Sequence, residues 1–215
     1  MFIERQYKIQ SRKNNKINLK VIPGHFATTQ SHINYYMDVS TLKARQIEAV
    51  EVAKTIAQDY QYDKPVDTII CIDGCDMIGA YLADELTKHG VSSKNIHHSL
   101  YVISPDFDSD GNISFSDNMR PMIDGKNVMV LLDTATTGKT VEKIIDCVIR
   151  DYGGYLQGIS AIFSYADEIY GEPIHAIFTK DDIPSYQTFT PGNCPHCANR
   201  ERLDAKINAN GYVEY

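Results

Sequence analysis

The chain lacks tryptophan, lacks any long apolar run and lacks an excess of basic residues. It has 14 Tyr and 7 Phe but no Trp, and we interpret most of these rings as core or interface residues rather than a stacking surface for nucleic acid. The formal net charge of −7 argues against nonspecific nucleic-acid binding. No apolar stretch reaches the length of a membrane span, and the N-terminus lacks the apolar centre of a signal peptide. With five cysteines, an odd number that does not suit a disulfide framework, these absences predict a cytoplasmic protein without nucleic-acid or membrane partners.

Hydrophobic periodicity predicts alternating strands and helices in a chain of 215 residues, long enough for one domain with a small appendage. A β-hairpin is expected over 6–22, ended by Pro23 and Gly24, and residues 25–40 are expected to be irregular. A helix should follow from Ser40 to about Tyr60. Further strands are expected at 66–73, 99–103, 127–133, 158–163 and 174–179, helices at 77–89 and 141–149, and a polar loop at 104–125. This alternation predicts an α/β fold with a parallel sheet covered on both faces.

The stretch Val128-Met-Val-Leu-Leu-Asp-Thr-Ala-Thr-Thr-Gly-Lys-Thr140 is the most informative part of the sequence. It reads as a buried strand, an acidic residue, a Thr/Gly loop and the start of a helix. The first amides of a helix lack internal partners and carry partial positive charge, so they suit a phosphate. Asp133 suits sugar hydroxyls instead. We therefore predict a phosphosugar site, with the phosphate held by Thr136, Thr137, Gly138, Lys139 and Thr140.

The loop could also be a Walker A loop, a dinucleotide-binding fingerprint or an ordinary strand-to-helix turn. A Walker A loop needs Gly five residues before Gly138, and Asp133 stands there, where a carboxylate would repel phosphate. A dinucleotide fingerprint needs three spaced glycines, and this loop has one. An ordinary strand-to-helix turn is the remaining rival, because Thr and Gly are common turn residues. The clustering of an acid with several threonines favours the functional interpretation.

The same stretch resembles the signature of the type I phosphoribosyltransferases. The segment from Gly24 to Asp38, with Tyr35-Tyr36-Met37, resembles the hood that covers the base in orotate phosphoribosyltransferases. A Cys194-Pro-His-Cys197 tail is similar to that of some bacterial members. The order and spacing of these elements match over about residues 24–200. The resemblance implies a parallel-sheet type I fold with an N-terminal hood over 1–40, an α/β core over 41–185 and a tail with the CxxC motif over 186–215.

By resemblance, the protein would be a glycosyltransferase that joins a nitrogenous base such as orotate to phosphoribosyl pyrophosphate, with Mg²⁺ present. Asp133 would hold a ribose hydroxyl, and Tyr36 and Met37 would lie near the base. The turn Asp73-Gly74-Cys75-Asp76 would occupy the place of the pyrophosphate loop. The family also suggests a homodimer. The ligand would be a small-molecule phosphosugar or nucleotide of pyrimidine metabolism.

The chain departs from the family pattern at several positions. Leu132 replaces the first of two adjacent acids, and Ser164-Tyr165 replace an Asp-Arg pair. The loop 104–121 has several Asp and only Arg120, where orotate enzymes supply Lys, Arg and His to neutralise pyrophosphate. The catalytic loop is therefore degenerate. These departures keep open a second hypothesis, a non-catalytic sensor that binds phosphoribosyl pyrophosphate or a nucleotide, and a third, an interaction module with a vestigial site.

Residues 106–117 fit the oxygen-ligand spacing of a calcium loop. Asp106, Asp108 and Asp110 stand at positions 1, 3 and 5, Gly111 at position 6 and Asp117 at position 12. These acids are a candidate Ca²⁺ site. The same sequence also suits a solvated acidic hairpin with an Asp-Gly turn, which we favour because no helices are predicted on either side.

The tail motif Cys194-x-x-Cys197 has the spacing of half a zinc site, but the sequence shows no second half. Two packed thiols are the preferred interpretation, ahead of a metal site or a redox pair. His25 and His32, in the hood segment, suit ligand contact and loop hydrogen bonds equally.

Overall fold

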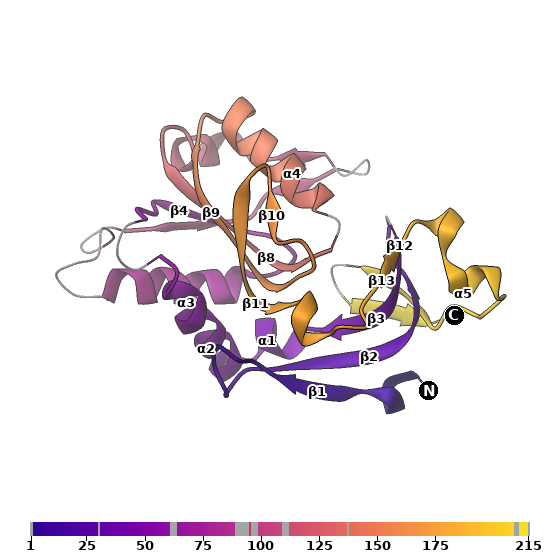
Figure 1. Ribbon diagram of the computed structural model, residues 1–215. Coiled ribbons are helices and arrows are strands. Elements are labelled where there is room, and N and C mark those ends of the chain that lie inside the picture. Colours follow the sequence, from indigo (N-terminus) through magenta and orange to yellow (C-terminus); the bar gives the residue numbers. More distant parts are fainter. Residues whose placement is uncertain are drawn as a thin grey trace.

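The computed structural model describes residues 2–29, 31–60, 64–88, 95, 99–108, 112–136, 138–208 and 211–214. Two larger β-sheets and a few helices make up the described chain (Figure 1). The central sheet has six strands in the order β10-β11-β9-β8-β4-β5. Its parallel strands are β4 (Thr68–Cys71), β5 (Tyr101–Ile103), β8 (Asn127–Ala135), β9 (Tyr155–Ser164) and β11 (Glu172–Thr179), and the antiparallel edge strand is β10 (Glu168–Ile169).

The strand order of this sheet locates its ligand-binding edge. Taken along the chain, β4 is the first parallel strand, β5 the second and β8 the third, so the spatial order is 2-1-3-4-5. The chain reverses direction across the sheet between β4 and β8. In open α/β sheets ligands bind outside the carboxyl ends of the strands at such a switch point. The turn after β4 and the loop after β8 are the segments found there.

Two layers of apolar side chains cover the central sheet, one on each face. Residues of β8 alternate between them: Met129 and Leu131 belong to the layer shared with α2 (Gln46–Ala57) and α3 (Asp76–Lys88), whereas Val130 and Leu132 face α4 (Lys139–Asp146). Because successive side chains of a strand point to opposite faces, Asp133 follows Met129 and Leu131 to the α2–α3 side.

The N-terminal segment and the C-terminal tail share a second sheet, which we call the hood sheet. Its order is β12-β3-β2-β13-β14, with β1 paired to β2. The strands are β1 (Tyr7–Gln10), β2 (Asn18–Ala27), β3 (His32–Asp38), β12 (Thr188–Phe189), β13 (Ala205–Asn208) and β14 (Gly211–Glu214). In Figure 1 the yellow tail lies alongside β2 and β3, although the two regions are at opposite ends of the sequence. The three-part division of the chain stays a prediction.

Two sequence predictions for the N-terminal region are wrong. Strand β2 was expected to end at Pro23 and Gly24, but it continues to Ala27. The pairing of β2 with β3 shifts register between Pro23 and Phe26, and this irregularity accommodates the two residues. Gly is required there, since a Cβ at Gly24 would collide with the side chains of Asp204 and Phe26. Most of the segment expected to be irregular is strand β3, which gains hydrogen-bonding partners from β2 and from the distant β12.

Two predicted helices are also modified. The helix expected from Ser40 is divided into α1 (Ser40–Ala44) and α2 because Arg45 has an extended backbone. The helix expected over 141–149 ends as α4 at Asp146 and continues as a π turn, η3 (Cys147–Asp151). A π turn is wider than an α turn, and Ile149 is 47% exposed rather than on the buried face.

The remaining elements are short. They are η1 (Phe2–Arg5), β6 (Asp106–Phe107), β7 (Ile113–Ser114), η2 (Asp117–Met122), η4 (Lys180–Asp182), η5 (Pro191–Asn193) and α5 (Pro195–Ala198). Among the helices of the described chain, none combines the length and apolar character needed to cross a membrane.

Candidate functional site

A buried ion pair occupies the switch point of the central sheet. Asp133, at the carboxyl end of β8, is 7% exposed, and its Oδ2 lies 2.7 Å from Nζ of Lys43 in α1. The same ammonium donates to the backbone carbonyl of Asp73, 2.6 Å away, in the turn after β4. The hydroxyl of Thr134 donates to the other oxygen of Asp133. One lysine thus joins the ends of the two strands that flank the switch point.

The carboxyl group of Asp73 faces this pair, in an environment that disfavours its ionised form. Burial raises its pKa, the neighbouring charge of Asp133 raises it further, and Lys43 offsets part of the effect, leaving a pKa of about 6. Two carboxylates therefore share one ammonium. With both acids ionised the trio carries one excess negative charge, which is a reason for a cation to accompany any phosphate that binds here.

The predicted phosphate loop forms a tight turn into α4. Gly138 is the N-cap residue, with φ +75°, and is buried. A Cβ at this position would lie 2.9 Å from Cδ1 of Ile169, so both the backbone conformation and the space require glycine. Lys139 and Thr140 form the exposed first turn of the helix, and Thr136 is half-buried before it. Thr137 lies outside the described residues.

The predicted pyrophosphate turn lies directly across from Asp133. Asp73 and Gly74 both have positive φ, 53° and 75°, which turns the chain sharply from β4 into α3. Cys75 is fully buried. Burial, followed by the charge of Asp133, raises the pKa of its thiol. Asp76 begins α3, is exposed and accepts a hydrogen bond from the hydroxyl of Ser104. Of this turn, Asp73 is the residue that contacts the buried ion pair.

The hood residues predicted near the base come from β3. Tyr36 is 7% exposed and packs against the rings of Phe26 and Tyr212. Its pKa is raised by burial and then by the charges of Asp38 and Asp133, so its ring lies within electrostatic range of the candidate ribose position. Met37 is 5% exposed and belongs to the same apolar layer as α2 and α3. Their contact with a base stays a prediction.

The positions that depart from the family pattern have structural roles. Leu132 is 1% exposed and packs under α4, so it offers no ligand atom. Ser164 is buried and donates to the carbonyl of Ala166. Arg120 donates to the carbonyl of Asp151 and lies over the ring of Tyr152. None of these three supplies charge to the ion pair.

The acidic loop forms a small hairpin of β6 and β7. Asp106, Asp108 and Asp117 are exposed, and the carboxylate of Asp108 accepts bonds from the backbone and side-chain amides of Asn112. Asp110 and Gly111 lie outside the described residues. A Ca²⁺ site in this loop stays a prediction.

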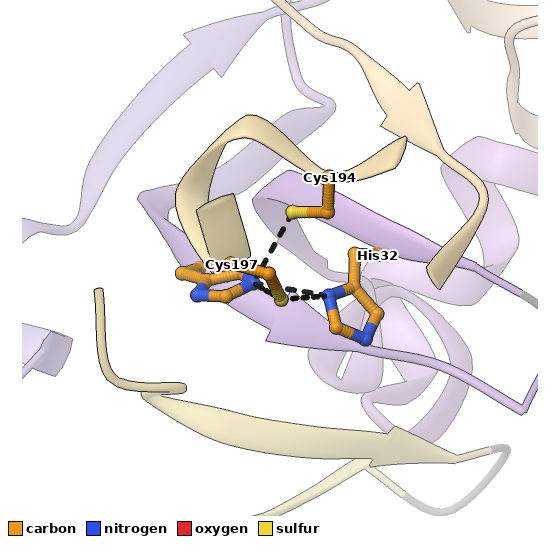
Figure 2. Close-up of side chains that lie close together, drawn as sticks. His32, Cys194 and Cys197 are labelled. Carbon is orange, nitrogen blue, oxygen red and sulfur yellow. Dashed lines mark hydrogen bonds between the residues drawn. The ribbon is translucent and has the colours of Figure 1, made fainter. Parts of the chain in front are cut away.

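A second cluster lies in the hood sheet. His25 of β2, His32 of β3, Cys194 and Cys197 place one ligand atom each within 4.8 Å of one another, and they are the group of potential metal ligands found in the described part of the chain. Figure 2 shows His32, Cys194 and Cys197 directed toward a common point. In the sequence, the two cysteines have the spacing of half a zinc site. The fold brings His25 and His32 to them from segments more than 160 residues away.

Lys43 is the site residue that the sequence did not reveal. It lies 90 residues from Asp133 and three residues into a short helix, with nothing in its local pattern to separate it from a surface lysine. Its side chain is only 13% exposed because α1 is set against the switch point of the central sheet.

Comparison with solved structures gives the fold. A phosphoribosyltransferase of Corynebacterium diphtheriae matches with a TM-score of 0.53 and 16% identity, covering 76% of this chain and 90% of that one. Orotate phosphoribosyltransferase of Mycobacterium tuberculosis, in complex with Fe(III) dicitrate, matches at 0.51 and 15%, covering 77% and 92%. UMP synthase of Leishmania donovani matches at 0.55 and 16%, and the match covers 76% of this chain but 34% of that one.

A fourth structure, adenine phosphoribosyltransferase of Trypanosoma brucei with AMP, pyrophosphate and ribose-5-phosphate, matches with a TM-score of 0.50 and 12% identity, covering 80% and 79%. No protein-family model matches the sequence, and no curated protein sequence matches it. The structural matches confirm the α/β fold class and the resemblance inferred from the loop after β8. The chain has the fold of the type I phosphoribosyltransferases.

Proposed function

We propose that this protein binds phosphoribosyl pyrophosphate or a nucleoside monophosphate at Asp133–Thr140 and transfers phosphoribose to a nitrogenous base. The observation that carries the proposal is the joining of three features at one switch point. These are a buried acid at the end of β8, a glycine turn that opens α4, and a lysine that bridges to the turn after β4.

The 5-phosphate would lie at the start of α4. The amides of the first helical turn point toward this end of the helix, and Thr136 and Thr140 flank Gly138 in the sequence. Amide donors and the helix dipole together favour an anion at this position. The close approach of Ile169 fixes the turn on its inner side.

The ribose would lie against Asp133. A carboxylate is a strong acceptor for sugar hydroxyls, and the contact with Lys43 orients that of Asp133. No covalent nucleophile is needed, because the base can attack C1 of the ribose directly while pyrophosphate leaves. Positioning of the two reactants would then supply most of the rate.

Pyrophosphate would lie beside Lys43 and the 73–76 turn, accompanied by Mg²⁺ as part of the substrate. The lysine contributes one positive charge and Asp73 and Asp133 contribute two negative charges, so a bare polyanion is unfavourable there. Mg²⁺ binds carboxylate and phosphate oxygens and would reverse the local sign. Orotate is the first base to test, with Tyr36 and Met37 as its neighbours in the hood. A homodimer and a cytoplasmic location also stay proposals.

A non-catalytic sensor on the same scaffold is the second candidate. Leu132 is packed in the core and offers no charge, and Arg120 is directed to the carbonyl of Asp151 and the ring of Tyr152, which favours weak assistance to the departure of pyrophosphate. Loss of one electrostatic stabiliser typically lowers kcat by about 10²–10³. A protein with these departures would bind substrate more readily than it turns it over.

The test is pyrophosphate release with Mg²⁺–phosphoribosyl pyrophosphate and a panel of bases, together with calorimetric titration of the sugar phosphate. Asp133→Asn removes the charge that would hold the ribose, and Asp124→Asn, an exposed acid before β8, is the matched control. Release that requires one base and is lost in Asp133→Asn alone would support the transferase. Saturable binding without release would support the sensor. Absence of both binding and release would refute the site.

A further inference from the structure

The four side chains of the hood-sheet cluster form a set of ligand atoms with the dimensions of a tetrahedral metal site. Nε2 of His25 lies 3.0 Å from Nδ1 of His32, 3.4 Å from Sγ of Cys194 and 3.6 Å from Sγ of Cys197, and Sγ of Cys197 lies 3.3 Å from Nδ1 of His32. With zinc–nitrogen bonds of about 2.0–2.1 Å and zinc–sulfur bonds of about 2.3 Å, a tetrahedron has nitrogen–nitrogen edges of about 3.3 Å and nitrogen–sulfur edges of about 3.5 Å. The three nitrogen–sulfur separations lie within about 0.2 Å of these edges, and the nitrogen–nitrogen separation is about 0.3 Å shorter.

Hydrogen bonding does not account for the arrangement. Nε2 of His25 has three polar neighbours, which are the sulfurs of Cys194 and Cys197 and Nδ1 of His32. A ring nitrogen has either one lone pair or one hydrogen, so it can satisfy one of them. The convergence of all three is what four lone pairs directed at one central cation produce.

The orientation of His25 is fixed from outside the cluster. Its Nδ1 lies 3.1 Å from the backbone carbonyl of Glu201, which can only accept, so Nδ1 carries the hydrogen and Nε2 presents its lone pair. Metal-bound histidines are commonly held in this way, with the second nitrogen bonded to a carbonyl or carboxylate. His25 is also 3% exposed and its backbone amide donates to Asp204, so its position is set by the fold.

We infer that His25, His32, Cys194 and Cys197 bind one structural Zn²⁺ that fastens the C-terminal tail to the hood sheet. Two thiolates and two imidazoles in a tetrahedron are the preferred set for zinc. All four positions are taken by protein, so the site is closed rather than catalytic. Cys194 is the N-cap residue of α5 and Cys197 lies within that helix, whereas His25 lies on β2 and His32 on β3. The metal would therefore hold together segments at opposite ends of the sequence.

The competing interpretation is a Cys194–Cys197 redox pair. Both cysteines are free thiols in the structure. A redox pair requires neither histidine, whereas a metal site requires all four residues. The two interpretations therefore differ in what the histidines do, and a histidine variant separates them.

The experiment measures zinc and cobalt in the full-length protein. Purified protein is stripped with a chelator under reducing conditions, reconstituted with Zn²⁺ or Co²⁺, and examined by elemental analysis and visible absorption. We expect one zinc per chain, and with Co²⁺ the intense absorption of a tetrahedral thiolate site. Chelation should also lower the melting temperature, and hydrogen exchange should increase in both 191–208 and β2–β3.

Four variants sharpen the result. Cys197→Ser and His32→Ala, both at the outer side of the cluster, should each weaken zinc binding about tenfold or more. His196→Asn removes a ring that stacks on His25 but turns its Nδ1 to Glu201, and it should keep one zinc. Cys147→Ser, a buried cysteine beyond α4, should also keep it.

The inference is overturned if reduced wild-type protein binds neither metal, or if His32→Ala binds zinc as tightly as the wild type. A Cys194–Cys197 disulfide in protein isolated with thiols blocked, together with absence of zinc, would establish the redox pair instead. The wild-type cobalt spectrum needs no variant, so the test holds even if a substitution prevents folding. The result is independent of phosphoribosyl pyrophosphate binding.

Discussion

Replacing Asp73 by Asn should stabilise the protein at neutral pH and not at acidic pH. The pKa of this carboxyl is raised from 3.8 to about 6 in the folded protein, first by burial and then by the charge of Asp133. Each unit of such a shift corresponds to about 1.4 kcal/mol, so the ionised carboxylate costs the folded state about 3 kcal/mol. Asn is isosteric and tolerates the left-handed backbone at this position, where φ is 53°.

The sign of the pH dependence follows from proton binding. Well below pH 4, Asp73 is protonated in both the folded and unfolded states and has no effect on stability. As the pH rises from about 4 to about 6, the unfolded chain releases its proton and the folded protein keeps it, so the free energy of unfolding falls. Above about pH 6 both states are ionised and the cost is constant. Between pH 4.5 and 7.5 the expected loss is about 2 kcal/mol.

The assay is urea denaturation of the wild type and Asp73→Asn at pH 4.5, 6 and 7.5. The difference in free energy of unfolding between the two proteins cancels the contribution of other titrating groups. It should grow in favour of the variant by about 2 kcal/mol over this range. Asp76→Asn, which changes an exposed acid in the same turn, is the matched control. Parallel pH profiles for the wild type and Asp73→Asn would refute the assignment of a strained carboxyl to this turn.

Two further substitutions test the same site. Lys43→Met leaves the buried carboxylate of Asp133 and the half-buried carboxylate of Asp73 without their cation, and it should lower the free energy of unfolding by about 3 kcal/mol. The loss should be larger at pH 7.5 than at pH 4.5, because protonation of Asp73 relieves part of the repulsion. An equal or larger loss at pH 4.5 would contradict this charge balance. Gly138→Ala combines a positive φ with a collision against Ile169 and should cost more than the roughly 1 kcal/mol expected for Gly125→Ala, where φ is also positive but the space is open. Calorimetry should show that Gly138→Ala also loses sugar-phosphate binding. Equal stability of the two glycine variants would show instead that the turn rearranges to accept the methyl group.

The central sheet and the turn from β8 into α4 could be predicted from sequence because their signals are local. A buried parallel strand is a continuous apolar run, and β8 shows one from Val128 to Leu132. The acid, the threonines and the glycine that follow lie within eight residues, so one helix start gathers them without help from the rest of the fold. The strand order then places Asp73 beside Asp133, since both lie at the carboxyl ends of parallel strands that end at the same edge.

The hood was predicted less well because its pairing is not local. Strand β3 is completed by β12, about 150 residues later in the chain, and β2 pairs in parallel with β13. A polar and aromatic segment without these partners carries no clear strand signal. Pro23 and Gly24 look like a strand end for the same reason, since only the paired strand shows that a register shift accommodates them.

Sequence alone therefore determined the fold class and the strand–turn–helix that we propose as the phosphosugar loop, whose residues are adjacent in the chain. Only the tertiary structure decided which distant side chains complete each site. Lys43 reaches Asp133 because α1 lies against the switch point, and His25 and His32 meet Cys194 and Cys197 because the tail joins the hood sheet. A side chain's partners across 90 or more residues depend on how whole elements pack, and no local pattern records that packing.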